Sequence, residues 1–157
     1  MKTVILLTSL SILSYCENVE EEVKAYDGWQ KVNELGFLNR DEVSKVYSQS
    51  KAGLVTLRPI VNYLDALPVK MFEYMAAGLP VISSDIKLWK EIIDDAECGI
   101  CVNPLEPKEI AEAIDYIVTH PEEAEQMGKN GKKAVLEKYN WDVEKKKLFE
   151  IYNNLLS

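Results

Sequence analysis

Short apolar runs alternate with amphipathic stretches over the first two thirds of the chain. The apolar runs predict five strands, at residues 3–8, 31–35, 53–57, 80–83 and 99–102. The amphipathic stretches between them predict helices near residues 17–26, 40–50, 68–77 and 88–94. This alternation is typical of βαβ units with right-handed crossovers, and therefore of a mostly parallel sheet. We predict an α/β fold, with a Rossmann-like parallel sheet flanked by helices.

Capping residues support these boundaries. Asn39 is suited to cap the helix that opens at Arg40, and Glu42 lies in its first turn. Gly78 stands where the helix ending at Ala77 must stop. Local chemistry and hydrophobic pattern therefore agree on where these helices begin and end.

Beyond residue 107 the pattern is helical to the end of the chain. It predicts helices at residues 107–120, 121–139 and 141–156, of which the first two open on Pro107 and Pro121 in the first turn. The last helix carries an apolar stripe at spacings of three and four, formed by Leu148, Ile151, Tyr152 and Leu155. We expect this stripe to pack against another surface.

The composition limits the class of protein. With 157 residues, 47% of them hydrophobic and 28% charged, the chain suffices for one globular domain with a substantial core, so we expect residues 1–157 to form a single domain. The net charge of −8 argues against coating nucleic acid or an anionic membrane, because long-range electrostatics would repel both. We expect a cytoplasmic protein with at most peripheral contact at the inner membrane face.

The first residues allow two interpretations. Met1-Lys2 followed by the apolar residues 4–13 has the length and charge of a signal-peptide core, and residues 13–16 faintly resemble a lipoprotein cleavage site. The alternative is a buried strand at residues 3–8 followed by the acidic helix, which continues the pattern downstream. We favour the strand. No other stretch is long enough to cross a bilayer.

The cysteines are too few for a disulfide scaffold. Cys98 and Cys101 are the only close pair, and a zinc site would need a second ligand pair that the single histidine, His120, does not supply. A redox pair requires a cysteine at a helix N-terminus, whereas this pair flanks the apolar Ile100. We therefore predict buried thiols at a strand edge, and no metal site.

The run PIVNYLDALPVKMFEYMAAGLPVISSD, from Pro59 to Asp85, holds most of the candidate chemistry. Asp65 and Glu73 stand eight positions apart, and Pro68 and Lys70 lie between them at a helix start. The free N–H groups there, the helix dipole and the lysine favour a phosphate, while a carboxylate further along suits a ribose diol. Charge spacing alone favours the alternative of a turn aspartate, a solvated lysine and a surface glutamate, because such trios are common.

Three segments make the chain from residue 35 to 156 resemble a known family. They are LGFLNRDEVSKVYSQSKAGLVTL, LPVKMFEYMAAGLPVISSD, and CGICVNPLEPKEIAEAI followed by MGKNGKKAVLEKYNWDVE. In this order they resemble the C-terminal, nucleotide-sugar-binding half of the family 4 (group 1) retaining glycosyltransferases, which have a two-Rossmann-domain architecture. Residues 1–28 match poorly, and residues 140–157 correspond to the C-terminal helix.

The resemblance implies roles for individual residues. Glu73 matches the residue that binds the nucleotide ribose, and Asp65 takes the place of the glutamate that touches the donor sugar. Lys70 would stabilise the leaving diphosphate. Leu67 and Pro68 belong to the same donor-binding motif, which with Lys70 resembles a subgroup associated with surface polysaccharide synthesis. The pair Phe37-Leu38 matches the loop that borders the base. These seven positions form the predicted site.

The same resemblance implies partners and missing parts. The donor would be a nucleotide diphosphate sugar, of UDP or GDP type, used without a metal; the acceptor would be a glycan or a lipid-linked sugar, bound by an N-terminal domain that this sequence lacks. The family's first strand, with the Arg and Lys that hold the pyrophosphate, has no match either. In the family that strand lies in mid-sheet, so either the N-terminal residues or another chain must fill the gap.

Two functions from different classes follow. One is the donor-binding half of a retaining glycosyltransferase, which we expect to be inactive as an isolated chain. The other is a truncated nucleotide-binding or interaction module that associates with itself or with a partner chain.

Overall fold

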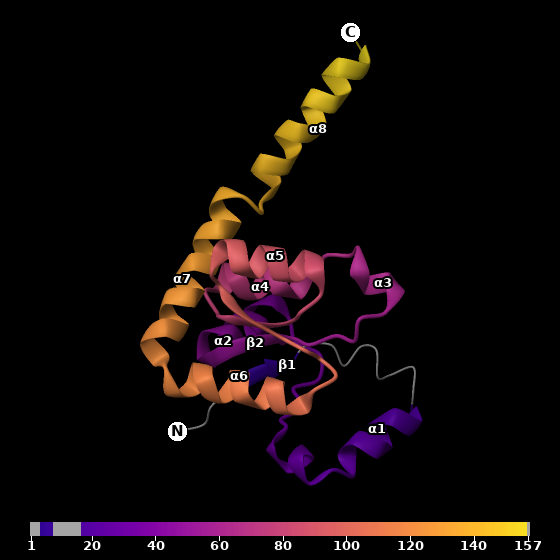
Figure 1. Ribbon diagram of the computed structural model, residues 1–157, viewed down its shortest axis with the longest axis vertical. Helices are drawn as coiled ribbons and strands as arrows, with labels where there is room; N and C mark the ends of the chain where they lie inside the picture. The colour runs from indigo at the N-terminus through magenta and orange to yellow at the C-terminus, as the bar shows by residue number, and fades with distance from the viewer. Residues whose placement is uncertain (1–3, 8–16, 157) are drawn as a thin grey trace.

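A four-stranded parallel sheet forms the centre of the molecule (Figure 1). The computed structural model describes residues 4–7 and 17–156, with side chains from residue 21 onward. The strands lie side by side in chain order, as β1 (Val4–Leu7), β2 (Ser50–Val55), β3 (Val81–Ser84) and β4 (Gly99–Val102). Every neighbouring pair is parallel. Successive parallel neighbours require a crossover between them, which the intervening helices supply.

Helices make up most of the remaining described chain. In order they are α1 (Glu17–Lys24), α2 (Arg40–Gln49), α3 (Val61–Leu64), α4 (Val69–Ala77), α5 (Lys87–Ala96), α6 (Pro107–Thr119), α7 (Pro121–Glu137) and α8 (Trp141–Leu156), with a 3₁₀ helix, η2 (Asp27–Lys31), after α1. The predicted fold class, a Rossmann-like parallel sheet flanked by helices with a helical C-terminal segment, is confirmed.

The predicted strand at residues 31–35 is wrong. Lys31 ends η2, and residues 32–36 have no regular structure. Val32 and Leu35, whose apolar side chains suggested a strand, are exposed to solvent. Gly36 then turns the chain with φ +64°, in the left-handed region, before the capping box of α2 begins. Two apolar residues separated by polar ones carry too little buried area to form a strand without a partner edge.

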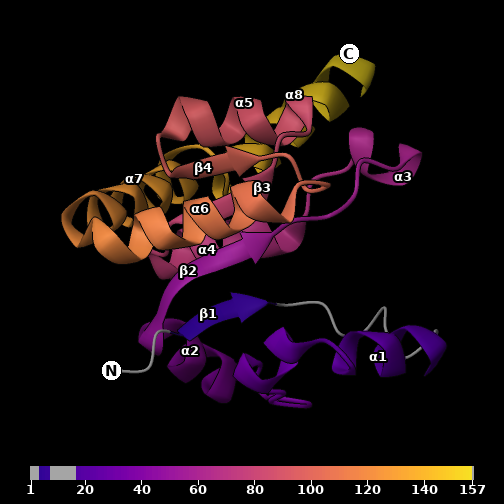
Figure 2. The ribbon, with the colours of Figure 1, turned by 60° about the horizontal axis from the view of Figure 1, so that its bottom comes forward.

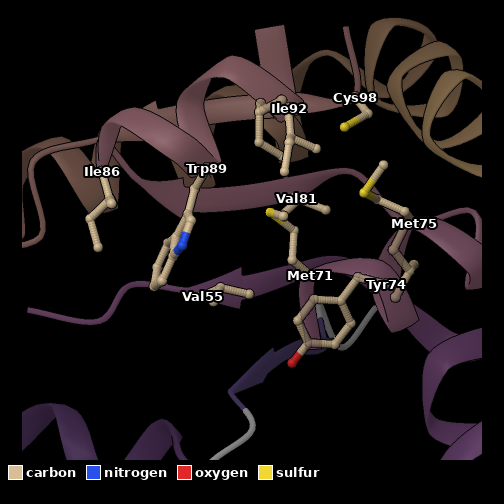
Figure 3. Close-up of a cluster of buried hydrophobic side chains, with 11 residues drawn as sticks. Val55, Met71, Tyr74, Met75, Val81, Ile86, Trp89, Ile92 and Cys98 are labelled. Atoms are coloured by element: carbon tan, nitrogen blue, oxygen red, sulfur yellow. The ribbon is translucent and has the colours of Figure 1, made fainter. Parts of the chain in front are cut away.

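Helices cover both faces of the sheet. On one face α4 and α5 pack over β2 and β3, where Tyr74, Met75 and Trp89 are fully buried (Figure 3). On the other face α6 packs over Ala52, Leu54 and Ile82 (Figure 2). The central strands β2 and β3 are therefore buried on both sides, as expected for a parallel sheet, while most of β4 is half-buried. This leaves the loops at the ends of the strands as the exposed parts of the sheet.

Helix α7 fixes the end of α4. Gly78 stops α4 in the left-handed conformation, with φ +76°. A Cβ added to Gly128 of α7 would lie only 2.1 Å from the Gly78 carbonyl oxygen. The two helices therefore meet backbone to backbone, which only a glycine at that crossing allows. The position of α4 is set by this contact as well as by the core.

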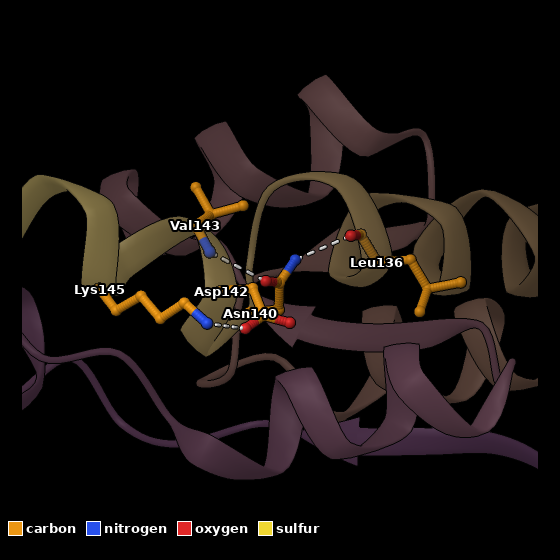
Figure 4. Close-up of polar contacts among 5 residues, drawn as sticks. All are labelled: Leu136, Asn140, Asp142, Val143 and Lys145. Carbon is orange, nitrogen blue, oxygen red and sulfur yellow. Dashed lines mark hydrogen bonds and ion pairs between the residues drawn. The ribbon is translucent and has the colours of Figure 1, made fainter.

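Asn140 shapes the junction between α7 and α8 (Figure 4). Its side-chain amide donates to the Leu136 carbonyl, at 2.8 Å, and its side-chain oxygen accepts from the Val143 N–H, at 3.0 Å. One side chain thus satisfies the end of one helix and the start of the next. Helix α8 then projects away from the body of the molecule (Figure 1).

The apolar stripe predicted on the last helix is exposed. Leu148, Ile151, Tyr152 and Leu155 all lie on α8 with open side chains. None of the strands and other helices in the described residues packs closely against α8. The prediction that the stripe packs on another surface is not met by the described part of this chain.

Residues Val4–Leu7 form strand β1, which pairs in parallel with β2 from Ser50 to Leu54. The strand interpretation of the N-terminal run is confirmed over these four residues, and β1 lies directly beside β2 with no gap between them. Residues 13–16, which carried the cleavage-site alternative, lie outside the described residues. Among the residues described, no helix is both long enough and apolar enough to span a membrane.

Candidate functional site

Helix α4 carries two of the predicted site residues and begins after a proline. Pro68 is the N-cap, with φ −74° and ψ 119°, and the helix runs from Val69 to Ala77. The structure therefore begins this helix one residue later than predicted. No side chain caps this end. The first-turn N–H groups of a helix generally lack an intrahelical partner. At this end the Met71 N–H donates to the Pro68 carbonyl at 3.1 Å, so the N–H groups of Val69 and Lys70 are those open to an acceptor.

Glu73 is the centre of a small polar cluster. Its Oε2 accepts a hydrogen bond from the Lys70 ammonium at 2.8 Å, and a second from the Tyr47 hydroxyl, also at 2.8 Å. Glu73 and Lys70 have side chains that are 39% and 42% exposed. The ion pair joins positions i and i+3 of one helix, whereas Tyr47 reaches in from α2. The sequence analysis missed Tyr47, because a contact across 26 residues leaves no local spacing signal.

The surroundings of Glu73 keep it charged. Partial burial alone would raise the pKa of this carboxyl, but the hydrogen bonds from Lys70 and Tyr47 outweigh it, and the pKa lies below its usual value. Burial is also the largest cause that raises the pKa of Tyr47, followed by the hydrogen bond to Glu73 and its charge. At neutral pH the arrangement is therefore a carboxylate held by a protonated phenol and an ammonium.

A buried tryptophan holds the loop before α4. The Nε1–H of Trp89, on α5, donates to the Ala66 carbonyl at 2.6 Å. Tyr63 of α3 lies against the same ring, with ring centroids 6.4 Å apart. Trp89 is fully buried and Ala66 is part of the loop from Asp65 to Leu67. This contact fixes the chain that leads into the helix start, and the sequence analysis had not identified it.

Ser84 anchors the start of the segment that links β2 to α4. The Ser84 hydroxyl, buried at the end of β3, donates to the Leu57 carbonyl at 2.6 Å. Leu57 follows strand β2, so the bond ties the beginning of the segment between β2 and α4 to the neighbouring strand. The segment between β2 and α4 is therefore fixed near its start by Ser84 of β3 and near its end by Trp89 of α5.

The remaining predicted residues lie on the surface. Asp65 follows α3, and its side chain makes no hydrogen bond or ion pair with another residue of the described chain. Leu67 is exposed and Pro68 is half-buried. Phe37, which follows the irregular residues 32–36, is 97% exposed, while Leu38 is half-buried. The structure thus joins Lys70 to Glu73 directly and leaves Asp65 and Phe37 without protein partners among the described residues.

The cysteine pair behaves as buried thiols, as predicted. Cys98 is fully buried in the core beside α4 and α5, and Cys101 is half-buried on β4; both are free. Burial raises the pKa of Cys98 to about 12 and that of Cys101 to about 11. Such thiols are almost entirely protonated at neutral pH and make poor nucleophiles. Across the described residues, no three His, Cys, Asp or Glu side chains are grouped as metal ligands.

Two solved structures share the fold of this chain. A sucrose-phosphate synthase from Thermosynechococcus elongatus superposes on 91% of this chain, which covers 35% of that protein, with a TM-score of 0.77 and 25% identity. The C-terminal domain of a glycosyl transferase group 1 family protein from Francisella tularensis superposes on 88% of this chain and is covered over 70% of its length, with a TM-score of 0.66 and 22% identity. The fold is that of a glycosyltransferase Rossmann-like domain.

The sequence identifies the family. The family model described as glycosyl transferases group 1 matches residues 14–134, and the chain belongs to that family. An uncharacterized glycosyltransferase of Methanocaldococcus jannaschii is 36% identical over 122 residues, which are 78% of this chain and 30% of that protein. The chain therefore spans about a third of the length of the curated relatives it matches. The resemblance stated from the sequence is confirmed.

Proposed function

We propose that this chain is the donor-binding half of a retaining glycosyltransferase that takes a nucleotide diphosphate sugar, of UDP or GDP type, as its donor. The observation that carries the proposal is the held carboxylate of Glu73 beside the open N-terminus of α4. A carboxylate accepts hydrogen bonds from a ribose diol, and a helix N-terminus favours a phosphate. Both groups occur together in a nucleoside diphosphate. Family membership supports this choice of ligand over other anions.

The Lys70 ammonium would bind the diphosphate of the donor. In the ligand-free protein its ammonium pairs with Glu73, but both side chains are about two-fifths exposed. Exposed ion pairs of this kind are typically worth only about 0–1 kcal/mol, so a doubly charged phosphate can compete for the ammonium at little cost. Together with the α4 N-terminus, Lys70 would then stabilise the charge that develops on the departing diphosphate.

The remaining predicted residues would complete the donor site. Asp65, exposed and without a protein partner in the described chain, would accept hydrogen bonds from the donor sugar. Leu67 and Pro68 would bring the backbone of the helix start to the phosphates, and Phe37 and Leu38 would lie beside the base. The 97% exposure of Phe37 leaves its side chain open to contact with the nucleotide base or with a second domain.

In the reaction, the bond between the anomeric carbon of the sugar and the diphosphate oxygen would break. A bond from an acceptor hydroxyl oxygen to the same face of that carbon would form, and the hydroxyl proton would pass to the leaving phosphate oxygen. We assign no general base and no metal. The acceptor, a glycan or a lipid-linked sugar of a surface polysaccharide, would bind to an N-terminal domain, and we expect the chain alone to be inactive.

Titration calorimetry of the 157-residue chain with UDP, GDP and ADP tests this proposal. We expect one of the three to bind, Glu73→Ala to abolish the binding, and Asp65→Ala to leave nucleotide affinity intact while weakening discrimination between donor sugars. Absence of binding by all three nucleotides at millimolar concentration would reject the donor site. Equal binding by the wild type and Glu73→Ala would reject the role of Glu73 alone.

The second candidate is an interaction module that needs a partner chain. It is favoured by the exposed apolar stripe of α8, which none of the other described helices and strands covers. Sedimentation equilibrium tests this candidate: a module that associates with itself forms dimers or larger species at micromolar concentration, and it binds the three nucleotides weakly or not at all.

A further inference from the structure

Tyr47 connects two helices at the candidate site. It lies near the end of α2, and its hydroxyl donates to Glu73 Oε2 of α4 at 2.8 Å. The hydrogen bond is partly buried. It therefore competes less with water than a bond between two open side chains would.

The position of the Tyr47 ring is set by the core. The ring packs edge-on against Tyr74, with centroids 5.6 Å apart and an interplanar angle of 75°. Tyr74 is fully buried, and its ring occupies the space in which a Cβ of Gly53 would lie, at 2.1 Å. Strand β2 thus fixes Tyr74, Tyr74 supports Tyr47, and the Tyr47 hydroxyl meets Glu73. A side chain held in this way returns to one position instead of sampling several rotamers.

The two donors to Glu73 share one of its oxygens. Lys70 and Tyr47 both bond Oε2, and no donor in the described part of the chain bonds Oε1. A carboxylate can accept about four hydrogen bonds, so Oε1 keeps its full capacity. We propose that Tyr47 is a positioning residue, which holds Glu73 by Oε2 so that Oε1 is presented to the ribose hydroxyls of a nucleoside diphosphate. This inference rests on the proposed function.

Tyr47 and Lys70 have different parts in this arrangement. The Lys70 side chain is 42% exposed and sits on the first turn of α4, so a bound phosphate can draw its ammonium away from Glu73. Tyr47 cannot follow, because its ring is fixed against Tyr74. The Tyr47 hydroxyl then remains the hydrogen-bond donor that keeps Glu73 in place while the ligand is bound. The raised pKa of Tyr47, caused first by burial and then by Glu73, keeps this phenol a donor.

The experiment compares ribose with dideoxyribose. Affinities of the wild type and of Tyr47→Phe are measured by calorimetry for UDP, GDP and ADP and for their 2′,3′-dideoxy forms. Losing one hydrogen bond to a charged group corresponds to roughly a tenfold change in affinity. We expect Tyr47→Phe to bind the ribonucleotide about tenfold more weakly than the wild type, to bind the dideoxy form equally well, and so to lose most of its discrimination.

Two variants serve as controls. Tyr139 is a half-buried tyrosine whose ring contacts Phe72 of α4. Tyr139→Phe also removes a hydroxyl and should change the affinity for neither the ribonucleotide nor its dideoxy form. Lys70→Ala should weaken both forms of the nucleotide to the same extent, because it acts on the phosphates. Circular dichroism of each variant verifies the fold, which Tyr47→Phe should retain because the ring and its contact with Tyr74 remain.

A second measurement needs no ligand. Carbon-detected NMR titration of the Glu73 carboxyl should show that its pKa is higher in Tyr47→Phe than in the wild type, because one bond to the charged form is gone. An unchanged pKa, unchanged discrimination, or an equal loss for both nucleotide forms would overturn the inference while leaving the nucleotide site in place. No binding of any nucleotide by the wild type would overturn both the inference and the proposed function.

Discussion

Replacing Gly128 by alanine should destabilise the protein, although alanine is the better helix former. Gly128 lies within α7, where exchanging glycine for alanine normally stabilises a helix by about 1 kcal/mol. Here the new Cβ would lie 2.1 Å from the Gly78 carbonyl oxygen and 2.9 Å from its carbonyl carbon. Relief of this overlap requires α7 to move away from α4, because both groups are backbone.

The magnitude follows from two opposing effects. Overpacking typically costs about 1–3 kcal/mol, and a clash between two backbones belongs at the upper end because no rotamer can absorb it. Subtracting the helix-propensity gain of about 1 kcal/mol leaves a net destabilisation of about 2 kcal/mol. For a chain of this size, that corresponds to a fall in the melting temperature of about 4–8 °C.

Urea unfolding followed by circular dichroism measures the effect. Gly131→Ala is the matched control on the same helix, because its Cβ would lie 3.1 Å from the Cys98 Cβ and 3.3 Å from the Met75 Cγ, contacts that need only small adjustments to relieve. We expect that variant to remain within about 1 kcal/mol of the wild type. A Gly128→Ala protein as stable as the wild type, or more so, would show that α7 does not meet α4 as described.

Three further predictions concern single contacts. Asn39→Ala removes the capping box with Glu42 and should lower the free energy of unfolding by about 1 kcal/mol, measured by urea unfolding; no change would deny the cap. Trp89→Phe removes the Nε1–H bond to Ala66; because Ala66 is exposed, water can replace the lost donor, so the hydrogen bond itself accounts for about 0.5–1.5 kcal/mol of stability, and the freed loop should be cleaved faster by a protease; an unaltered cleavage rate would contradict its anchoring role. The lowered pKa of Glu73 means that its ionisation stabilises the folded protein above the unfolded pKa and that this contribution disappears as the pH falls through the folded pKa; Glu73→Gln should therefore be less stable than the wild type at pH 7, the difference should shrink as the pH falls through the folded pKa of Glu73, and a difference that does not change with pH would refute this account.

The sequence predicts the elements that rest on local signals. The helix that Asn39 caps and the stop at Gly78 appear where capping chemistry requires them. Pro107 and Pro121 open their helices in the first turn. These signals act within three or four residues, so they can be recognised without knowing the fold.

The errors come from residues whose structure depends on distant neighbours. Val32 and Leu35 suggested a strand, but no sheet edge receives them. The short helix α3 (Val61–Leu64) lies between the strand predicted at residues 53–57 and the helix predicted at 68–77, where no element was predicted, because it has only four residues and no side chain caps its N-terminus. Such segments follow the packing of the whole chain.

The candidate site likewise combines residues that local signals identify with residues that depend on long-range contacts. Glu73 and Lys70 could be identified from the helix start and the family motif, and the structure joins them directly. Tyr47 could not, because its bond to Glu73 depends on how α2 packs beside α4. The role of Trp89 in holding Ala66 likewise arises only when α5 folds over the sheet. Long-range contacts of this kind carry no periodicity in the sequence.

The most direct test of the central claim is to map a bound nucleotide onto the chain by NMR. Amide shifts of the 157-residue protein are recorded during titration with whichever of UDP, GDP and ADP binds most tightly. We predict the largest shifts at the start of α4, from Val69 to Glu73, with small changes along α6. Saturating binding that shifts α6 and leaves the start of α4 unchanged would contradict the claim that Glu73 and the α4 N-terminus form the donor site.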